Sequence, residues 1–189
     1  SYRYGPLLVF ALNTGFREGE LLALSKSGIM TVDGRRAYHV YETVSTVKNR
    51  DKDASTKTKR ILTAPKYPRS VRTVPLNKEA EYCLDLMLGY YETSTVRDDL
   101  IVTTKTGLLP TARNIQLTLD RILKRAGLPH YGTHALRHTF ATRLLRKTQN
   151  HQELKAVAEL LGDDYKVVVK TYLHTEEQGK GGLVDLLTA

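Results

Sequence analysis

Residues 132–140 have the sequence GTHALRHTF, which places two histidines and an arginine within five positions. If residues 134–145 form a helix, His134, Arg137 and His138 share one face of it, because residues three and four positions apart are neighbours on a helix surface. Leu136 and Phe140 lie on another face and indicate a core on that side. The stretch therefore predicts a helix with one apolar face and one cationic face.

Three interpretations of the cationic face are open. One is a solvated surface, because arginine and histidine are common on exposed helix faces. A zinc pair formed by His134 and His138 is another interpretation, but the glutamate that accompanies such pairs is missing. A phosphate suits arginine beside histidine better, because a guanidinium donates a planar pair of hydrogen bonds to phosphate oxygens.

A second arginine stands in NTGFREGELLAL, residues 13–24. Arg17 lies in a glycine-bracketed turn just before a helix start, where backbone N–H groups also favour anions. Glu20 is either an acid at the start of that helix or a partner that orients Arg17.

Helical periods dominate the chain. Residues 7–11 and a segment from about residue 19 suggest two short helices, and an apolar stripe marks a longer helix over residues 80–91. Thr111 and Asn150 stand where the N-caps of two further helices are expected, and Gly127 and Gly162 end those helices. The helix that contains residues 134–138 is expected over residues 133–147.

Residues 29–47 differ, since IMTVDGRRAYHVYETVSTV is rich in β-branched and aromatic residues and Asp33-Gly34 is a hairpin signal. RSVRTVPL, residues 69–76, alternates like a further strand. Residues 48–60, KNRDKDASTKTKR, have no apolar period and are interpreted as a mobile basic loop. The sequence predicts one α+β domain over residues 1–189, mainly α with one small antiparallel sheet.

The 189 residues carry a formal net charge of +9 with a pI of about 9.6, which favours an anionic partner. Nucleic acid is the first candidate and an acidic membrane surface the second. No apolar run approaches the ~20 residues of a membrane span, and no signal peptide opens the chain. Cys83 is the only cysteine, which rules out an internal disulfide, fits a reducing cytoplasm and leaves zinc without an obvious site.

Four stretches together resemble a known set, the signatures of the tyrosine recombinase (phage integrase) catalytic domain. They occur in the family's order and span residues 4 to 174: TGFREGELLAL, PKYPRSVRTVPL, HALRH and LLGDDYKVVVKTYLH. Each is weak alone, but four in order are specific. The resemblance implies the integrase catalytic-core fold, mainly α with a small antiparallel sheet.

The resemblance implies catalytic roles for five residues. Arg17 and Arg137 match the two arginines of the family, and His134 matches the histidine three residues before the second arginine. Lys66 matches the lysine on the family's β-hairpin, and Tyr172 matches the nucleophile.

The match to the family is less clear at the lysine and at the position after LLG. Lys57 and Lys59 are rivals of Lys66, but they lie farther from the SVRTVPL strand. Asp163 stands where the family usually has a histidine or tryptophan that contacts the scissile phosphate. We expect Asp163 to point away from that phosphate, and either to cap the helix that carries Tyr172 or to pair with a nearby arginine or lysine.

The implied function is site-specific DNA recombination or integration. Strands are cleaved and rejoined through a 3′-phosphotyrosine link without ATP, metal ion or other cofactor, for integration or excision of a bacterial or phage mobile element. Alternatives are DNA relaxation like that of a type IB topoisomerase, or a catalytically silent DNA-binding module. The basic loop is expected to contact DNA phosphates through Lys48, Arg50, Lys57, Lys59 and Arg60.

The resemblance also implies an assembly on double-stranded DNA. Four protomers are expected on two paired sites, with a monomer off DNA and accessory DNA-bending proteins as further expectations. Full-length members add an N-terminal DNA-binding domain that is absent here, and the chain starts without methionine, so we expect it to be part of a longer protein. Residues 175–189 are a candidate packing segment, on a neighbour or on their own domain.

Overall fold

The structure, a computed structural model, describes residues 2–51 and 56–170. Tyr172 and the candidate packing segment 175–189 lie outside the described residues. The helices are α1 Gly5–Thr14, α2 Glu18–Leu22, α3 Lys78–Tyr90, α4 Ala112–Arg125, α5 His134–Leu145 and α6 His151–Leu161. The strands are β1 Ile29–Val32, β2 Arg35–Val40, β3 Thr43–Lys48, β4 Thr58–Thr63 and β5 Arg72–Pro75. Two short 3-10 turns, η1 Lys26–Gly28 and η2 Pro68–Ser70, complete the elements, and residues 165–170 are helical.

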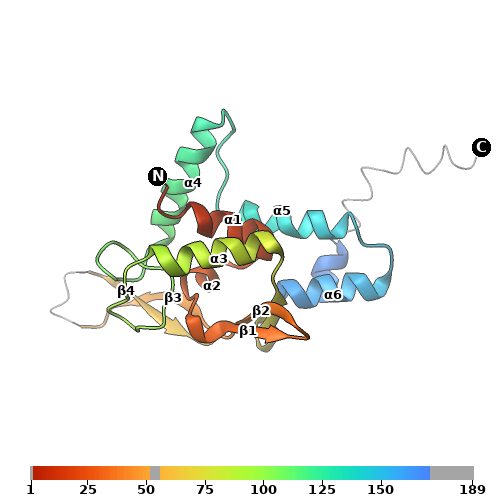
Figure 1. The fold of residues 1–189 in the computed structure, drawn as a ribbon, viewed down its shortest axis with the longest axis horizontal. Coiled ribbons are helices and arrows are strands. Elements are labelled where there is room, and N and C mark those ends of the chain that lie inside the picture. Colours follow the sequence, from red (N-terminus) through yellow and green to blue (C-terminus); the bar gives the residue numbers. More distant parts are fainter. Residues whose placement is uncertain (1, 52–55, 171–189) are drawn as a thin grey trace, which may run out of the picture.

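Helix α1 lies at the centre of the helical layer, with α3 and α5 packed along it (Figure 1). Most of its apolar residues are buried, and Leu7 and Phe10 have no exposed surface. Leu84 and Met87 of α3 and Ile115 of α4 join the same core. A smaller core lies where α5 meets α6 and residues 165–170; it consists of Leu145, Leu154, Val157, Ala158, Leu161 and Val168.

The predicted helix ends are largely confirmed. Thr111 caps α4 by accepting a hydrogen bond from Asn114 N, and Asn150 caps α6 by accepting one from Glu153 N. Gly162 ends α6 in the left-handed region at φ 63°. These local signals therefore set the lengths of α4 and α6.

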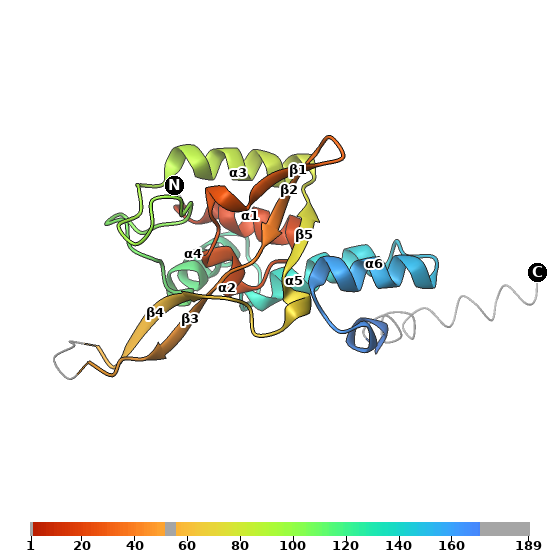
Figure 2. The ribbon, with the colours of Figure 1, turned by 90° about the horizontal axis from the view of Figure 1, so that it is seen from below.

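Two antiparallel sheets are present among the described residues, where one was expected. In the first, β2 lies between β1 and β5, and Asp33 and Gly34 form the predicted hairpin turn at φ 50° and 73°. In the second, β3 pairs with β4 in a hairpin that extends away from the body (Figure 2). The interpretation of residues 48–60 as one basic loop is therefore wrong at its ends, since Lys48 closes β3 and residues 58–60 open β4.

The fold class is confirmed as mainly α with small antiparallel sheets. Within residues 2–51 and 56–170, none of the helices has the length and apolar character needed to cross a membrane.

Candidate active site

Arg137 is held from three sides by acceptors that come from distant parts of the chain. It projects from α5 and is buried, with 7% of its side chain exposed. Its Nη1 donates to Gly15 O at 2.6 Å, and its Nη2 donates to Leu161 O and to Asp163 Oδ2, both at 2.7 Å. Burial lowers the pKa of this guanidinium, and the carboxylate of Asp163 opposes that shift. The carboxylate therefore compensates a charge that α5 has carried into the interior.

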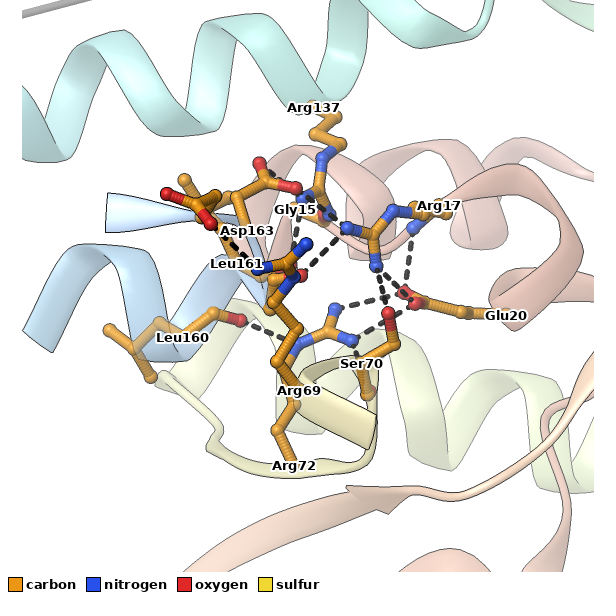
Figure 3. Close-up of polar contacts among 12 residues, drawn as sticks. Gly15, Arg17, Glu20, Arg69, Ser70, Arg72, Arg137, Leu160, Leu161 and Asp163 are labelled. Carbon is orange, nitrogen blue, oxygen red and sulfur yellow. Dashed lines mark hydrogen bonds and ion pairs between the residues drawn. The ribbon is translucent and has the colours of Figure 1, made fainter. Parts of the chain in front are cut away.

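Arg17 lies beside Arg137, at the N-cap of α2 (Figure 3). Its Nη2 donates to Gly162 O at 2.8 Å and to Asp163 Oδ1 at 2.6 Å. Its Nη1 donates to Glu20 Oε1 at 3.0 Å and to Ser70 Oγ at 3.2 Å. The structure thus brings the two predicted arginines together around one carboxylate.

Asp163 takes one of its two expected roles, but it does not point away from the predicted phosphate site, because its carboxylate faces the two arginines expected to hold the phosphate. Pairing with an arginine is confirmed, and it involves both Arg17 and Arg137. The capping role is wrong, because Asp164 accepts from Lys166 N at 2.9 Å at the start of helical residues 165–170. Asp164 also pairs with Arg69 at 2.7 Å. Its position one residue nearer the helix explains why it takes the cap.

A buried ion pair that was not predicted lies behind Arg17. Glu20 accepts two hydrogen bonds from Arg72, at 2.9 and 2.8 Å. Its Oε2 also accepts from Arg17 N at 2.8 Å. Burial alone raises the pKa of Glu20, but the hydrogen bonds and charges of Arg72 and Arg17 outweigh it and leave the pKa below its usual value. Arg72 was overlooked although it stands inside SVRTVPL, where its charge at a buried strand position was the available signal.

His134 and His138 flank the arginines at a cavity of about 240 Å³ that Arg17, Arg137 and Asp163 also line. The two rings meet edge to face with centroids 4.9 Å apart. Although part of its surface stays exposed, desolvation lowers the pKa of His134, and the charges of His138 and Arg137 lower it further. His134 is therefore placed as a neutral proton acceptor next to the arginines. Within the described part of the chain, no group of three or more metal-type ligands forms.

Lys66 lies in the connection between β4 and η2, not on a hairpin, so that part of the expectation is wrong. It is exposed, and its Nζ lies 5.4 Å from the ring centroid of Tyr67. Lys59 does lie on the β3–β4 hairpin, and Lys57 directly precedes β4. Among residues 2–51 and 56–170, no hydrogen bond or ion pair joins Lys66 to Arg17, and its role stays a prediction.

The basic residues of the expected DNA-contacting loop lie on and around the β3–β4 hairpin. Lys48, Arg50, Lys57 and Lys59 are exposed, and Arg60 is half-buried. Lys59 and Arg60 line a groove of about 620 Å³ between this hairpin and the start of α4, where Arg113 adds a further cation. The hairpin therefore presents its positive charge beside an open groove.

The sequence profile of the phage integrase family matches residues 1–178. A tyrosine recombinase XerC-like protein of Caldanaerobacter subterraneus subsp. tengcongensis is 31% identical over 199 residues, which cover 98% of this chain and 49% of the relative. Tyrosine recombinase XerC of Yersinia pestis is 35% identical over 108 residues, 57% of this chain and 35% of the relative. The chain thus spans about half, or less, of the length of these curated relatives.

Solved structures share the fold. The Tn1549 transposon integrase in complex with transposon right end DNA matches with a TM-score of 0.73 and 20% identity, over 99% of this chain and 59% of that one. The XerH site-specific recombinase bound to palindromic difH substrate matches with a TM-score of 0.69 and 23% identity, over 100% of this chain and 48% of that one. The resemblance carried by the four sequence motifs is confirmed, and the chain belongs to the phage integrase family.

Proposed function

We propose that this chain is the catalytic domain of a site-specific tyrosine recombinase. The observation that carries the proposal is the meeting of Arg17 and Arg137 around a single carboxylate, with His134 at the same cavity. Arg17 and Asp163 are separated by 146 positions in the chain, so the fold assembles this anion site from its two ends. Two guanidiniums that converge on one anion suit a phosphodiester.

The chemistry follows from the charges. The phenol of Tyr172 has an ordinary pKa near ~10, so it is a weak nucleophile in neutral water. In the proposed reaction its oxygen attacks the scissile phosphorus while the bond to the 5′ oxygen breaks, which leaves a 3′-phosphotyrosine. Arg17 and Arg137 stabilise the charge that develops on the phosphoryl oxygens.

Two protons move in this step. His134 accepts the tyrosyl proton, which its lowered pKa supports because the imidazole is then neutral at pH 7. Lys66 donates a proton to the departing 5′ oxygen; this assignment rests on the family match and not on a contact. The phosphotyrosine retains the energy of the broken bond, so rejoining with another strand needs no ATP.

Double-stranded DNA is the proposed partner. The relatives are tyrosine recombinases by name, and the Tn1549 integrase and XerH were solved with DNA. We further propose four copies on two DNA sites, integration or excision of a mobile element, and a bacterial cytoplasm. Accessory DNA-bending proteins stay a prediction.

Trapping of a covalent adduct tests the function. Wild-type protein is incubated with a nicked suicide duplex that carries the end sequences of the parent element, and the adduct is mapped by mass spectrometry. Tyr172→Phe should bind the duplex and form no adduct. Tyr165→Phe is the matched control, since it removes a phenol that precedes Tyr172 in the sequence and whose hydroxyl contacts His151, and it should keep the adduct.

The other outcomes separate the alternatives. Adduct formation by Tyr172→Phe would refute the assigned nucleophile. Relaxation of supercoiled DNA without any specific site would favour a topoisomerase, and DNA binding without any adduct would favour a silent binding module.

A further inference from the structure

Arg17 has no terminal N–H left for a substrate. Each of its two terminal nitrogens makes two hydrogen bonds, to Glu20 and Ser70 on one side and to Gly162 and Asp163 on the other. A terminal nitrogen of arginine carries two hydrogens, so these four acceptors use all of them. A phosphate oxygen can accept from this edge only after one of the four has left.

Asp163 is the acceptor best suited to leave. Glu20 and Ser70 are buried, and Gly162 contributes a backbone carbonyl, whereas Asp163 is a side chain with 28% of its surface exposed at the cavity. Its two oxygens each take one guanidinium, at 2.6 Å from Arg17 and 2.7 Å from Arg137. This is the geometry in which two oxygens of a phosphate would be held.

A phosphate and this carboxylate cannot share the position. Both are anions, and like charges a few ångströms apart in a partly desolvated site repel strongly. We propose that Asp163 is an internal competitor of the scissile phosphate: its carboxylate occupies the anion position between Arg17 and Arg137 until DNA displaces it. This inference rests on the proposed function for the identity of the displacing anion.

The position of Asp163 in the chain extends the consequence toward the nucleophile. Asp163 follows Gly162, which ends α6 in the left-handed region, and precedes Asp164, which caps helical residues 165–170. Arg17 also holds the carbonyl of Gly162, and Arg137 holds that of Leu161. Residues 161–163, which link α6 to the segment before Tyr172, are thus hydrogen-bonded to both Arg17 and Arg137. Displacement of the carboxylate removes one of the contacts that hold this linker, so phosphate binding is coupled to the position of the linker.

The test measures anion binding without DNA. Inorganic phosphate is titrated into the folded protein by calorimetry, for wild type, Asp163→Asn and Asp163→Ser. Both variants remove the competing charge, and the phosphate affinity should rise by on the order of tenfold, as for loss of a partly exposed bridging ion pair. Asp85→Asn removes an equal charge from the exposed pair with Arg36 and should leave the affinity unchanged.

A double variant locates the effect. In an Arg17→Ala background, the gain from Asp163→Asn should shrink, because the carboxylate then competes at one guanidinium only. An unchanged or weaker phosphate affinity in folded Asp163 variants would overturn the proposal, since Asp163 would then arrange the arginines instead of competing for them.

A wild-type measurement covers the case in which the variants do not fold. The carboxyl carbon signal of Asp163 in NMR should move together with the guanidinium signals of Arg17 as phosphate is added. A static Asp163 signal while Arg17 responds would overturn the proposal. Neither readout needs Tyr172 or strand cleavage, so failure of the recombinase assignment would show separately, as absence of the covalent adduct.

Discussion

The carboxylate of Glu20 accepts hydrogen bonds from both terminal nitrogens of Arg72, at 2.9 and 2.8 Å. The side chains of this pair are only 3% and 5% exposed. Arg17 contacts the same carboxylate at 3.0 Å. Arg72 in turn donates through Nε to Leu160 O at 2.7 Å. The pair therefore ties α2 and β5 to the end of α6, directly behind the two arginines of the site.

Glu20→Gln should destabilise the protein more than any exposed carboxylate does. Removal of one charge from a buried pair leaves the other uncompensated, which typically costs about 3–5 kcal/mol of unfolding free energy. Cleavage should fall as well, because Arg17 loses an anchor. Urea denaturation at pH 7 measures the first effect, and Asp85→Asn, from an exposed ion pair, is the control with nearly no loss.

The ion pair of Glu20 should also make the stability of the protein depend on pH. The pKa of Glu20 is depressed in the folded state, so its contribution is present above the unfolded value, near ~4.3, and is lost as pH falls through the folded value. The melting temperature of wild type should therefore decrease when the pH is lowered below about 4. Glu20→Gln should flatten that drop; an identical acid limb in both proteins would contradict the assignment.

His138 should set the pH range in which His134 works. His134 acts as a proton acceptor only when neutral, and its pKa is lowered, so cleavage should persist below the usual histidine pKa near ~6.5 and fall at more acidic pH. His138→Gln removes one neighbour that lowers this pKa. The acid limb of the pH profile, in which the cleavage rate falls as His134 is protonated, should therefore move to higher pH.

The controls for this profile are two further histidine variants. His134→Gln should lower the cleavage rate by about 10²-fold or more, as loss of a general base does. His130→Gln, from an exposed pair with Asp120, should leave the limb in place. A limb that stays fixed in His138→Gln would mean that a group other than His134 controls it.

Local signals predicted much of this fold, and long-range contacts account for what they missed. Asp33-Gly34 and the caps at Thr111 and Asn150 act within a few residues, so their outcome is visible in sequence. Strand β4 begins inside KNRDKDASTKTKR because it pairs with β3. The first residues of β4 are polar, so no alternation of apolar and polar residues marks the strand in the sequence. The two arginines were identified from motifs.

The partners of these arginines were predicted only in part: Glu20 was a candidate partner of Arg17, and Asp163 was expected to pair with an arginine or lysine that the sequence does not specify. The contact between Glu20 and Arg72 spans 52 positions and that between Arg17 and Asp163 spans 146. A pattern of a few residues cannot predict which of several acids folds onto a given guanidinium. Only the assembled helices show that Asp163, and not Asp164, reaches both arginines.

Charge on the β3–β4 hairpin should govern the salt dependence of DNA binding. If Lys48, Lys57 and Lys59 contact phosphates, neutralising each should reduce the slope of log affinity against log salt by about 0.9. Binding titrations at several salt concentrations measure the slope, with exposed Lys78 of α3 as the matched control. An unchanged slope in the triple variant would mean that the hairpin faces solvent in the complex.

Gly15 should be needed both for packing and for the placement of Arg137. It adopts φ 65°, and an added Cβ would lie 2.3 Å from Cδ1 of Phe140. Its carbonyl accepts from Arg137 Nη1 at 2.6 Å. Gly127 has nearly the same φ, 67°, with nothing within 4 Å of an added Cβ, so Gly127→Ala isolates the backbone penalty of about 1–2 kcal/mol. Gly15→Ala should exceed that by about 1–3 kcal/mol for overpacking, measured by urea denaturation.

Cleavage separates the two glycines further. Gly15→Ala should also slow adduct formation, because relief of the clash by a shift of α1 or α5 moves the carbonyl away from Arg137, whereas Gly127→Ala should not. Phe140→Leu in the Gly15→Ala background removes the nearest ring atoms, so it should recover part of both the stability and the rate. Recovery of stability alone would show that the carbonyl of Gly15 is not what positions Arg137, and equal losses in the two alanine variants would show that Phe140 simply rotates aside.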